Sequence, residues 1–341
     1  MVGANASNRS KGAGQLMMTG LLIALVAGIA SATMFASIAS GAVISLLLFY
    51  MAPLPLMVAA LGWGSTTALV GGALAGIGLA AVFSLSYMAA FTLTVALPAW
   101  WLGHLALLAR PMSNDPQLAS LVSTETAPAL DWYPTGRILL WIVFFACLTT
   151  SAALLTLGSD EASITAELRR GLMRVVGGRT GTTSADTDRL VDVLAAIAPA
   201  AATIIAMTTL TMNLWLSAKI TTTSGRMKRP WPDLRMTTMP KIALVALVVS
   251  LLLSFVGSLI GLLAQIVSSG MMMAYALTGF ATLHTLTQTM SGRTFVISAA
   301  YVGTLFIGWP ILGMVSLGIA DAVFEFRQTY WTKRGPPAPK S

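Results

Sequence analysis

The longest uncharged stretch of the sequence constrains the fold more than any other feature. Residues 12–109 are 98 consecutive positions without Asp, Glu, Lys or Arg. Soluble domains contain about a quarter charged residues, whereas charged residues make up 9% of this 341-residue chain. These figures exclude a soluble enzyme. We expect an all-α fold, a polytopic transmembrane helical bundle that forms one membrane-embedded unit.

The uncharged runs also predict the number of membrane crossings, because a bilayer core about 30 Å thick needs about 20 apolar residues per helix. Four more runs follow the first one, at residues 138–159, 193–218, 242–292 and 294–320. The first run has room for four helices, and the run 242–292 has room for two. We therefore expect nine or ten crossings.

Two proline-containing segments decide between these numbers. Pro53 and Pro55 interrupt the second apolar segment, where they predict a kink, a broken helix or a re-entrant turn. Trp309 and Pro310 lie near the middle of the last run, which predicts a hairpin of two helices, about Thr294–Gly308 and Pro310–Trp331. Proline at the start of the second helix is favourable, because its missing N–H is not needed there.

The basic residues predict orientation, since Lys and Arg in short loops favour the cytoplasm. Residues 219–241 contain six cations and a single acid, Asp233, and both ends of the chain are basic. Ten crossings in a bacterial inner membrane, with both termini cytoplasmic, place all three basic segments on the same side. The expected order is a cytoplasmic leader at 1–14, a four-helix membrane region at 15–109, a polar loop at 110–137, two membrane helices at 138–218, a basic cytoplasmic loop at 219–241, a C-terminal membrane region at 242–331 and a tail at 332–341.

The region 138–218 includes a polar, extracytoplasmic excursion at residues 158–190. Within it, apolar residues recur every four positions, which predicts a short amphipathic helix at the membrane surface. These residues are Ile164, Leu168, Leu172 and Val176. Ser159 and Asp160 can cap its start. A surface loop is the alternative, and the following "GGRTGTTSADTD" is typical of a flexible linker.

The sequence contains no recognisable catalytic, metal-binding or nucleotide-binding pattern. No carboxylate lies in an expected span before Asp321, Cys147 stands alone, and no zinc or phosphate-loop motif is present. The positive charges border apolar runs instead of forming one face of a polar domain, which argues against a nucleic-acid partner. We expect a protein that is not an enzyme, with no cofactor and with the lipid bilayer as its surroundings.

Three polar residues inside apolar runs are candidates for binding a solute: Asn213, Gln265 and His284. A buried amide without a partner costs about 1 to 3 kcal/mol, so each needs a hydrogen-bonding group nearby. A ligand could supply that group. A neighbouring helix could supply it equally well, as is common within membrane bundles.

A row of small residues runs along the first helix at intervals of four, namely Ala24, Gly28, Ala32, Ala36 and Ser40. A second row comprises Ala68, Gly72, Gly76, Ala80 and Ser84. Such rows allow helix backbones to approach closely within lipid. Gly28, Ala32, Ala36 and Ser40 are therefore candidates for a partner interface, and internal packing is the alternative.

Several segments in order resemble the YybS-like bacterial membrane proteins, which are distantly similar to the S components of energy-coupling-factor transporters. These segments are "YMAPLPLMVAALGWG" (50–64), "ALPAWWLGH" (96–104), "NLWLSAK" with "RPWPDLRMTTMP" (213–240), "LTGFATLHTLT" (277–287) and "GIADAVFEFRQ" (318–328). The resemblance implies a helical subunit that captures a solute and docks on a transmembrane coupling subunit, with separate ATPase subunits. In S components the docking helix carries Ala-x-x-x-Ala, a spacing that Ala32 and Ala36 satisfy. The alternative function is a membrane scaffold or assembly factor that binds no solute.

Overall fold

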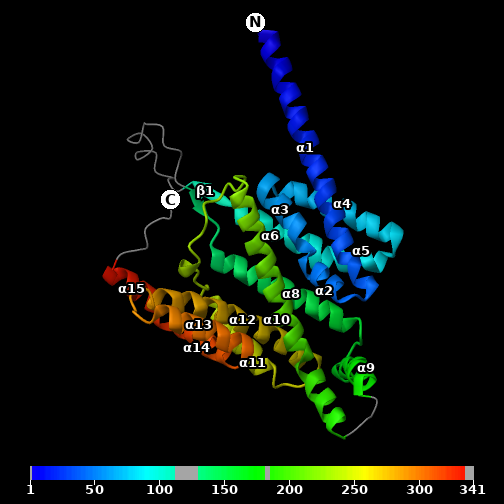
Figure 1. Ribbon diagram of the computed structural model, residues 1–341, viewed down its shortest axis with the longest axis vertical. Coiled ribbons are helices and arrows are strands. Elements are labelled where there is room, and N and C mark those ends of the chain that lie inside the picture. The colour runs from blue at the N-terminus through cyan, green and yellow to red at the C-terminus, as the bar shows by residue number, and fades with distance from the viewer. Residues whose placement is uncertain (1, 112–129, 181–184, 335–341) are drawn as a thin grey trace. The chain divides into compact units, whose positions relative to one another are not determined.

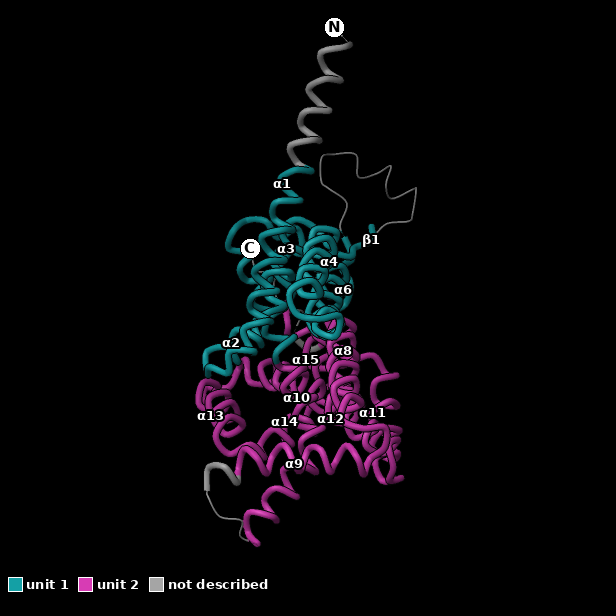
Figure 2. The backbone as a smooth tube through the Cα atoms, turned by 90° about the vertical axis from the view of Figure 1, so that its right-hand side faces the viewer, with its two compact units in different colours: residues 1–134, 209–232 teal, residues 135–208, 233–341 magenta. Residues whose placement is uncertain are grey.

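The computed structural model confirms the all-α class (Figure 1). It describes residues 2–111, 130–180 and 185–334, with side chains for residues 17–111, 130–176 and 185–332. Within these ranges the chain divides into two compact units, which Figure 2 colours separately. Unit 1 comprises residues 1–134 and 209–232, and unit 2 comprises residues 135–208 and 233–341.

Seven helical segments of the described chain are long and apolar enough to cross a membrane. They are Met17–Ser40, Val43–Trp63, Ser65–Val82, Leu85–Leu107, Thr135–Leu155, Ala185–Thr223 and Ser258–Leu286. Three shorter apolar helices, Ile242–Leu253, Arg293–Phe306 and Pro310–Phe324, occupy the remaining apolar stretches. Four of these candidate spans lie in the first uncharged run.

Large apolar side chains cover much of the outer surface of these helices. Val43 is 91% exposed, Phe295 is 79% exposed and Leu305 is 78% exposed. Exposed apolar surface on this scale is unfavourable in water but is matched by the hydrocarbon core of a bilayer. The protein is therefore an integral membrane protein whose helices contact lipid.

Unit 1 is a group of short and long helices with one small hairpin. Its elements are α1 (Val2–Ala36), a 3-10 turn (Ser37–Ser40), α2 (Val43–Met51), α3 (Pro53–Trp63), α4 (Ser65–Val82), α5 (Leu85–Phe91), a π-helical turn (Thr92–Ala96), α6 (Leu97–Leu107), β1 (Ala109–Pro111), β2 (Leu130–Trp132) and the last part of α10 (Ala185–Thr223). The strands β1 and β2 pair antiparallel. The sequence did not predict this pairing within the polar loop 110–137.

Pro53 and Pro55 lie where two helices meet within one candidate span. Helix α2 ends at Met51, and α3 starts with Pro53, where the missing N–H is harmless. Because Val43–Trp63 is a single span by length and composition, the segment fits the broken-helix alternative. At the far end of α3, Gly64 adopts a φ of 111°, which favours glycine, and α4 begins at the next residue.

Helices α1 and α4 make the most extensive contact between helices in the described part of unit 1. A Cβ atom added to Gly28 would collide with the carbonyl group of Gly71, and one added to Gly71 would collide with the carbonyl of Ala24. Glycines at these two positions therefore allow the backbones to touch. The row on α1 is used for internal packing at Ala24 and Gly28.

Unit 2 contains α8 (Thr135–Leu155), α9 (Glu161–Thr180), the first part of α10, a 3-10 turn (Leu234–Met236), α11 (Ile242–Leu253), α12 (Ser258–Leu286), α13 (Arg293–Phe306), α14 (Pro310–Phe324) and α15 (Phe326–Arg334). Its long central helix is α12, which packs against α8, α11 and α14. Tyr275 and Ile266 of α12 are completely buried in this packing.

The amphipathic helix expected in the polar excursion is present as α9. Asp160 accepts a hydrogen bond on Oδ1 from the backbone N–H of Ser163 (2.8 Å), as expected of a residue that caps the helix start. Ile164 is fully buried in a cluster with Leu154 and Ile266, and Leu168 packs against this cluster. The apolar side of α9 therefore packs on helices of unit 2.

Two expected boundaries need correction. The stretch 177–188 does not form a continuous linker, because α9 extends to Thr180 and α10 begins at Ala185, while 181–184 lie outside the described residues. The last run is divided before Pro310 as expected, but the second helix ends at Phe324 instead of Trp331. Its end is set by Glu325, which adopts a left-handed conformation, and α15 begins at Phe326.

Candidate functional site

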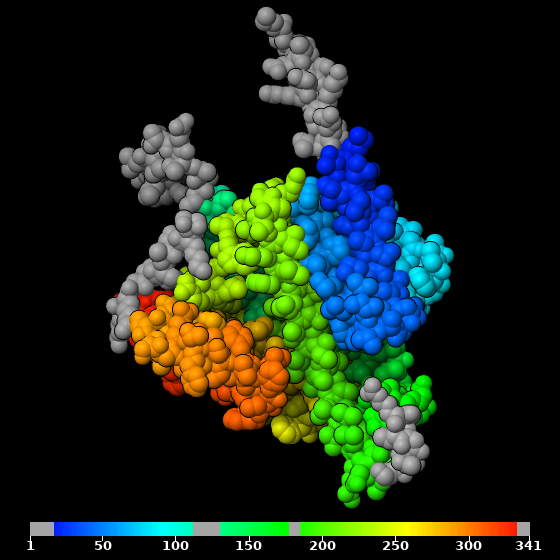
Figure 3. Space-filling view, in the orientation of Figure 1, coloured from blue at the N-terminus to red at the C-terminus, as the bar shows by residue number. Residues whose placement is uncertain are grey.

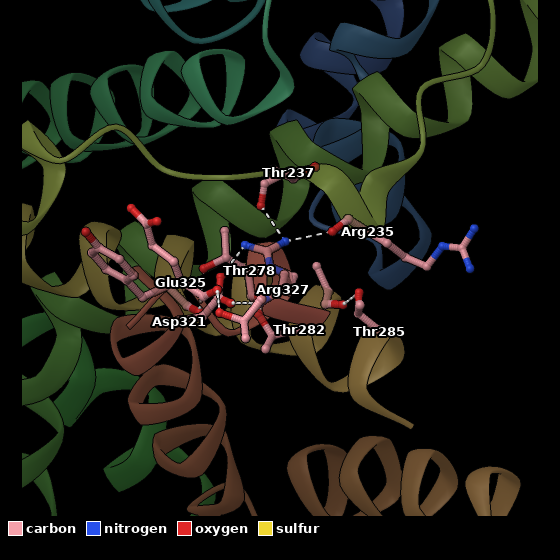
Figure 4. A network of polar contacts seen from close by, with 11 residues as sticks. Arg235, Thr237, Thr278, Thr282, Thr285, Asp321, Glu325 and Arg327 are labelled. Atoms are coloured by element: carbon pink, nitrogen blue, oxygen red, sulfur yellow. Dashed lines mark hydrogen bonds and ion pairs between the residues drawn. The ribbon is translucent and has the colours of Figure 1, made fainter. Parts of the chain in front are cut away.

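A buried ion pair lies in unit 2, where α14 meets α15 (Figure 4). The guanidinium group of Arg327 donates from Nε and Nη2 to Oδ2 of Asp321, at 2.8 and 2.6 Å. The backbone N–H of Arg327 donates to Oδ1 of the same carboxylate at 3.0 Å. Both side chains are almost completely buried, with exposures of 3% and 6%. A buried ion pair needs such complete hydrogen bonding to offset its desolvation.

The same arginine also holds the chain that leads into α11. Nη1 of Arg327 donates to the backbone carbonyl groups of Arg235 and Thr237, at 2.8 Å each. Arg235 forms its own ion pair with Asp233 at 2.7 Å, and this hydrogen bonding raises the pKa of Arg235. The second half of the basic segment 219–241 is thus attached to the α14–α15 turn.

Helices α12 and α14 approach closely beneath this network. A Cβ atom at Gly318 would collide with the carbonyl group of Tyr275, and one at Gly279 would collide with the carbonyl of Met314. The hydroxyl groups of Thr278 and Thr282 donate to carbonyl groups of their own helix, α12, one turn earlier. Because both hydroxyl groups are hydrogen-bonded within α12, they need no polar partner on α14.

A cavity of about 120 Å³ opens beside the ion pair. Lys241 and Glu325 line it with opposite charges, and their Nζ and Oε1 atoms are 3.8 Å apart. Its other polar lining groups come from Thr238, Thr278, Asp321, Arg327 and Gln328. This volume exceeds that of one bound water many times over, since a water needs roughly 10 to 15 Å³.

Asn213, one of the three candidates for solute binding, is buried in unit 1. Its Nδ2 donates to the backbone carbonyl groups of Tyr50 and Thr209, both at 2.8 Å. Its Oδ1 is also buried and has no donor among the described groups. The amide therefore has one satisfied end and one unsatisfied end.

The other two candidates, Gln265 and His284, both belong to α12 in unit 2. His284 contacts the hydroxyl of Tyr301 through Nε2 at 3.2 Å, and Gln265 is partly buried. Nineteen residues of continuous helix separate the two side chains, which corresponds to about 28 Å along the axis. They are therefore not placed to hold the same small solute.

The candidate partner interface on α1 has three different environments. Gly28 packs against the backbone of α4 and is not free to contact another protein. Ala32 and Ala36 line an apolar groove of about 300 Å³ between α1 and α4, together with Leu74, Gly78 and further apolar residues. Ser40 is exposed in the 3-10 turn that follows α1. Figure 3 shows α1, in blue, on the surface of unit 1.

A basic and aromatic surface lies at one end of unit 1. Lys219 lies over the ring of Trp231, Arg226 over Trp63 and Arg229 over Trp132, at 4.5 to 5.9 Å from the ring centres. Arg229 is 8% exposed and donates to the carbonyl group of Ala106, at the end of α6. Its burial lowers the pKa of Arg229. We call Lys219, Arg226, Lys228 and these three tryptophans the basic face of unit 1.

Sequence reasoning did not identify Asp321, Arg327 or Glu325 as parts of one site. One signal was available: Asp321 is the first carboxylate along the chain that falls in an expected span, and charged residues at such positions need a partner. The partner could not be chosen, because the spacing of six residues fits no regular helix contact. The left-handed turn at Glu325 produces the contact.

Comparison with known proteins supports the membrane assignment. Residues 177–322 match the model of a family described as predicted membrane protein (DUF2232). This range includes α10 to α14, except for the last residues of α14, and therefore most of unit 2. No curated protein and no solved structure matches the chain significantly.

Proposed function

We propose that this protein is a non-catalytic membrane scaffold that binds an acidic cytosolic protein through the basic face of unit 1. In this proposal the protein lies in a bacterial inner membrane, with residues 219–241 and both termini in the cytoplasm. The observation that carries the proposal is that two cations of this face, Lys219 and Arg226, lie over tryptophan rings instead of pairing with described carboxylates.

The charge on this face is available to a partner. Residues 219–232 contain four cations and no acid. Lys228 is exposed, and Trp231 is 37% exposed. Tryptophan and arginine are enriched among the residues that contribute most to protein interfaces, and complementary charge increases the rate of association. The face thus combines apolar contact area with positive charge that no described carboxylate neutralises.

A photo-cross-linking residue at Lys228 in the full chain, in living cells, tests the proposal. We expect adducts with a soluble acidic protein, and none from the same residue placed at Phe255, which is expected on the outer side. Lys219→Glu and Arg226→Glu should each reduce the adduct several-fold. Arg189→Glu makes the same charge change elsewhere and should leave the adduct unchanged.

Three outcomes would overturn this scaffold proposal. Adducts with lipid alone would mean that the face binds headgroups instead of a protein. Equal adducts from Lys228 and Phe255 would mean that the contacts are not specific. Equal losses in Lys219→Glu and Arg189→Glu would mean that the effect follows total charge and not this face.

A second function, solute capture by a subunit similar to an S component, is favoured by the groove on α1. Ala32 and Ala36 line the groove, and small side chains there leave space for the backbone of another transmembrane helix. The unsatisfied Oδ1 of Asn213 is a candidate contact for the solute, and Gln265 and His284 remain candidates as well. In this proposal the occupant of the groove is a helix of a coupling subunit, which works with ATPase subunits.

Substitutions in the groove test this second function. Ala32→Leu and Ala36→Leu fill the groove and should abolish co-purification of a coupling subunit and its ATPases. Gly20→Leu is the matched control, because a side chain at Gly20 meets open space on the same helix. This function would be contradicted if co-purification were unchanged in both Ala32→Leu and Ala36→Leu, or if the unaltered protein had no associated subunits.

A further inference from the structure

The cavity beside the Asp321–Arg327 ion pair has an unusual arrangement of charge. Lys241 and Glu325 face each other across 3.8 Å, which is too long for a hydrogen bond. Their side chains remain 91% and 45% exposed. Each charge is therefore able to accept a second partner inside the cavity, where Thr238 and Gln328 add a hydroxyl and an amide group.

Glu325 has a backbone conformation that residues other than glycine rarely adopt. Its φ and ψ are 54° and 40°, in the left-handed region. This conformation costs about 1 to 2 kcal/mol for a residue with a Cβ atom. It persists because the surrounding contacts fix it: the N–H of Glu325 donates to the carbonyl of Asp321, and Arg327 binds the Asp321 carboxylate from the other side of the turn. A strained residue whose carboxylate lines a cavity suggests a use for that carboxylate.

We propose that this cavity binds a small zwitterion that carries a phosphate and a primary ammonium group, which is the chemistry of phosphoethanolamine. Lys241, with Gln328 and Thr238, binds the phosphate oxygens. Glu325 accepts hydrogen bonds from the ammonium group. Because the ligand carries both charges, it satisfies both residues at once, and as a phosphodiester it adds no net charge to the cavity.

The position of the cavity along the helices fits the level of lipid headgroups. Lys241 directly precedes the apolar helix α11, and Glu325 directly follows the apolar helix α14. Charged residues at the ends of apolar helices lie where the hydrocarbon core meets water. The ligand can therefore be the headgroup of phosphatidylethanolamine or free phosphoethanolamine. This site lies wholly in unit 2 and does not depend on the function proposed for unit 1.

Native mass spectrometry of the full chain in mild detergent tests the proposal with three lipids of identical acyl chains. Phosphatidylethanolamine should be retained about tenfold more strongly than phosphatidylcholine, whose ammonium group has no N–H to donate, and than phosphatidylglycerol, which has no ammonium group. Glu325→Gln should remove the preference over phosphatidylcholine. Glu161→Gln, at the exposed start of α9, is the matched control and should keep the preference.

Glu325→Gly separates ligand binding from folding. This variant removes the carboxylate and also relieves the left-handed strain, so it should be at least as heat-stable as the unaltered chain while losing the preference. Displacement of the lipid by free phosphoethanolamine identifies the soluble compound as an alternative ligand, and resistance to it identifies the lipid. Equal retention of the three lipids, or a preference that survives in both Glu325→Gln and Glu325→Gly, would overturn the proposal.

Discussion

The carboxylate of Asp321 accepts three hydrogen bonds from Arg327, one from its backbone N–H and two from its guanidinium group. The two residues belong to different helices, α14 and α15, and the contact closes the turn between them. Since the same guanidinium also binds two carbonyl groups before α11, one side chain connects three segments of unit 2.

We predict that Arg327→Met is strongly destabilising. It leaves the Asp321 carboxylate buried without its partner, and removal of one member of a buried ion pair costs about 3 to 5 kcal/mol. Thermal unfolding in detergent measures the effect. Arg110→Met, which removes an ion pair with Asp131 on the exposed surface, should cost no more than about 1 kcal/mol. Similar losses for both variants would show that the Asp321 contact has no special importance.

The buried Arg229 of unit 1 should behave differently from Arg327. Its described contacts are the carbonyl of Ala106 and the ring of Trp132, with no carboxylate among them. Removal of this cation leaves no buried anion behind. We therefore expect Arg229→Met to change the free energy of unfolding by no more than about 1 kcal/mol. A loss as large as that of Arg327→Met in the same unfolding assay would contradict this explanation.

We predict that adding a single methyl group where α12 and α14 touch destabilises the protein. Gly318→Ala places a Cβ atom against the carbonyl of Tyr275, and overpacking of this kind costs about 1 to 3 kcal/mol. Gly313 lies on the same helix, and a Cβ there meets nothing within 4 Å. Gly313→Ala should therefore be neutral or slightly stabilising, because alanine favours helix. Equal unfolding temperatures for the two variants would show that the helices can separate without cost.

The proposed orientation can be tested with single cysteines, since Cys147 is the only one in the sequence. In a Cys147→Ser background, Lys228→Cys should react with a membrane-impermeant maleimide only when the cytoplasmic side is accessible. Phe255→Cys, between α11 and α12, should react only from the outside. Both positions are exposed in the structure, so whether the maleimide reaches them depends only on the side of the membrane on which they lie. The reverse labelling pattern would show that the orientation in the membrane is opposite to the one proposed.

Features that depend on local periodicity could be predicted from the sequence. The repeat of Ile164 and Leu168 every four residues, with Asp160 before it, identified α9, because one apolar side of a helix and a cap are both local signals. Pro310 likewise identified the start of α14. The length of the first uncharged run also indicated room for the four candidate spans that lie in it.

Features that depend on contacts between distant residues could not be predicted. The row on α1 did not reveal which of its members meets another helix, and the structure brings Gly28 against Gly71 while Ala32 and Ala36 stay accessible. The Asp321–Arg327 contact requires a left-handed residue that is not glycine, and no composition signal marks Glu325 for that role. In both cases the partner is chosen by the packing of whole helices.

Three apolar helices of unit 2 are short for a membrane protein. Helices α11, α13 and α14 contain 12, 14 and 15 residues, which correspond to about 18, 21 and 22 Å. A hydrocarbon core of about 30 Å would leave their ends below the headgroups, and a bilayer relieves such a mismatch by thinning locally. Lipids beside these helices would then be compressed, so that water and charged side chains reach deeper than they do elsewhere around the protein.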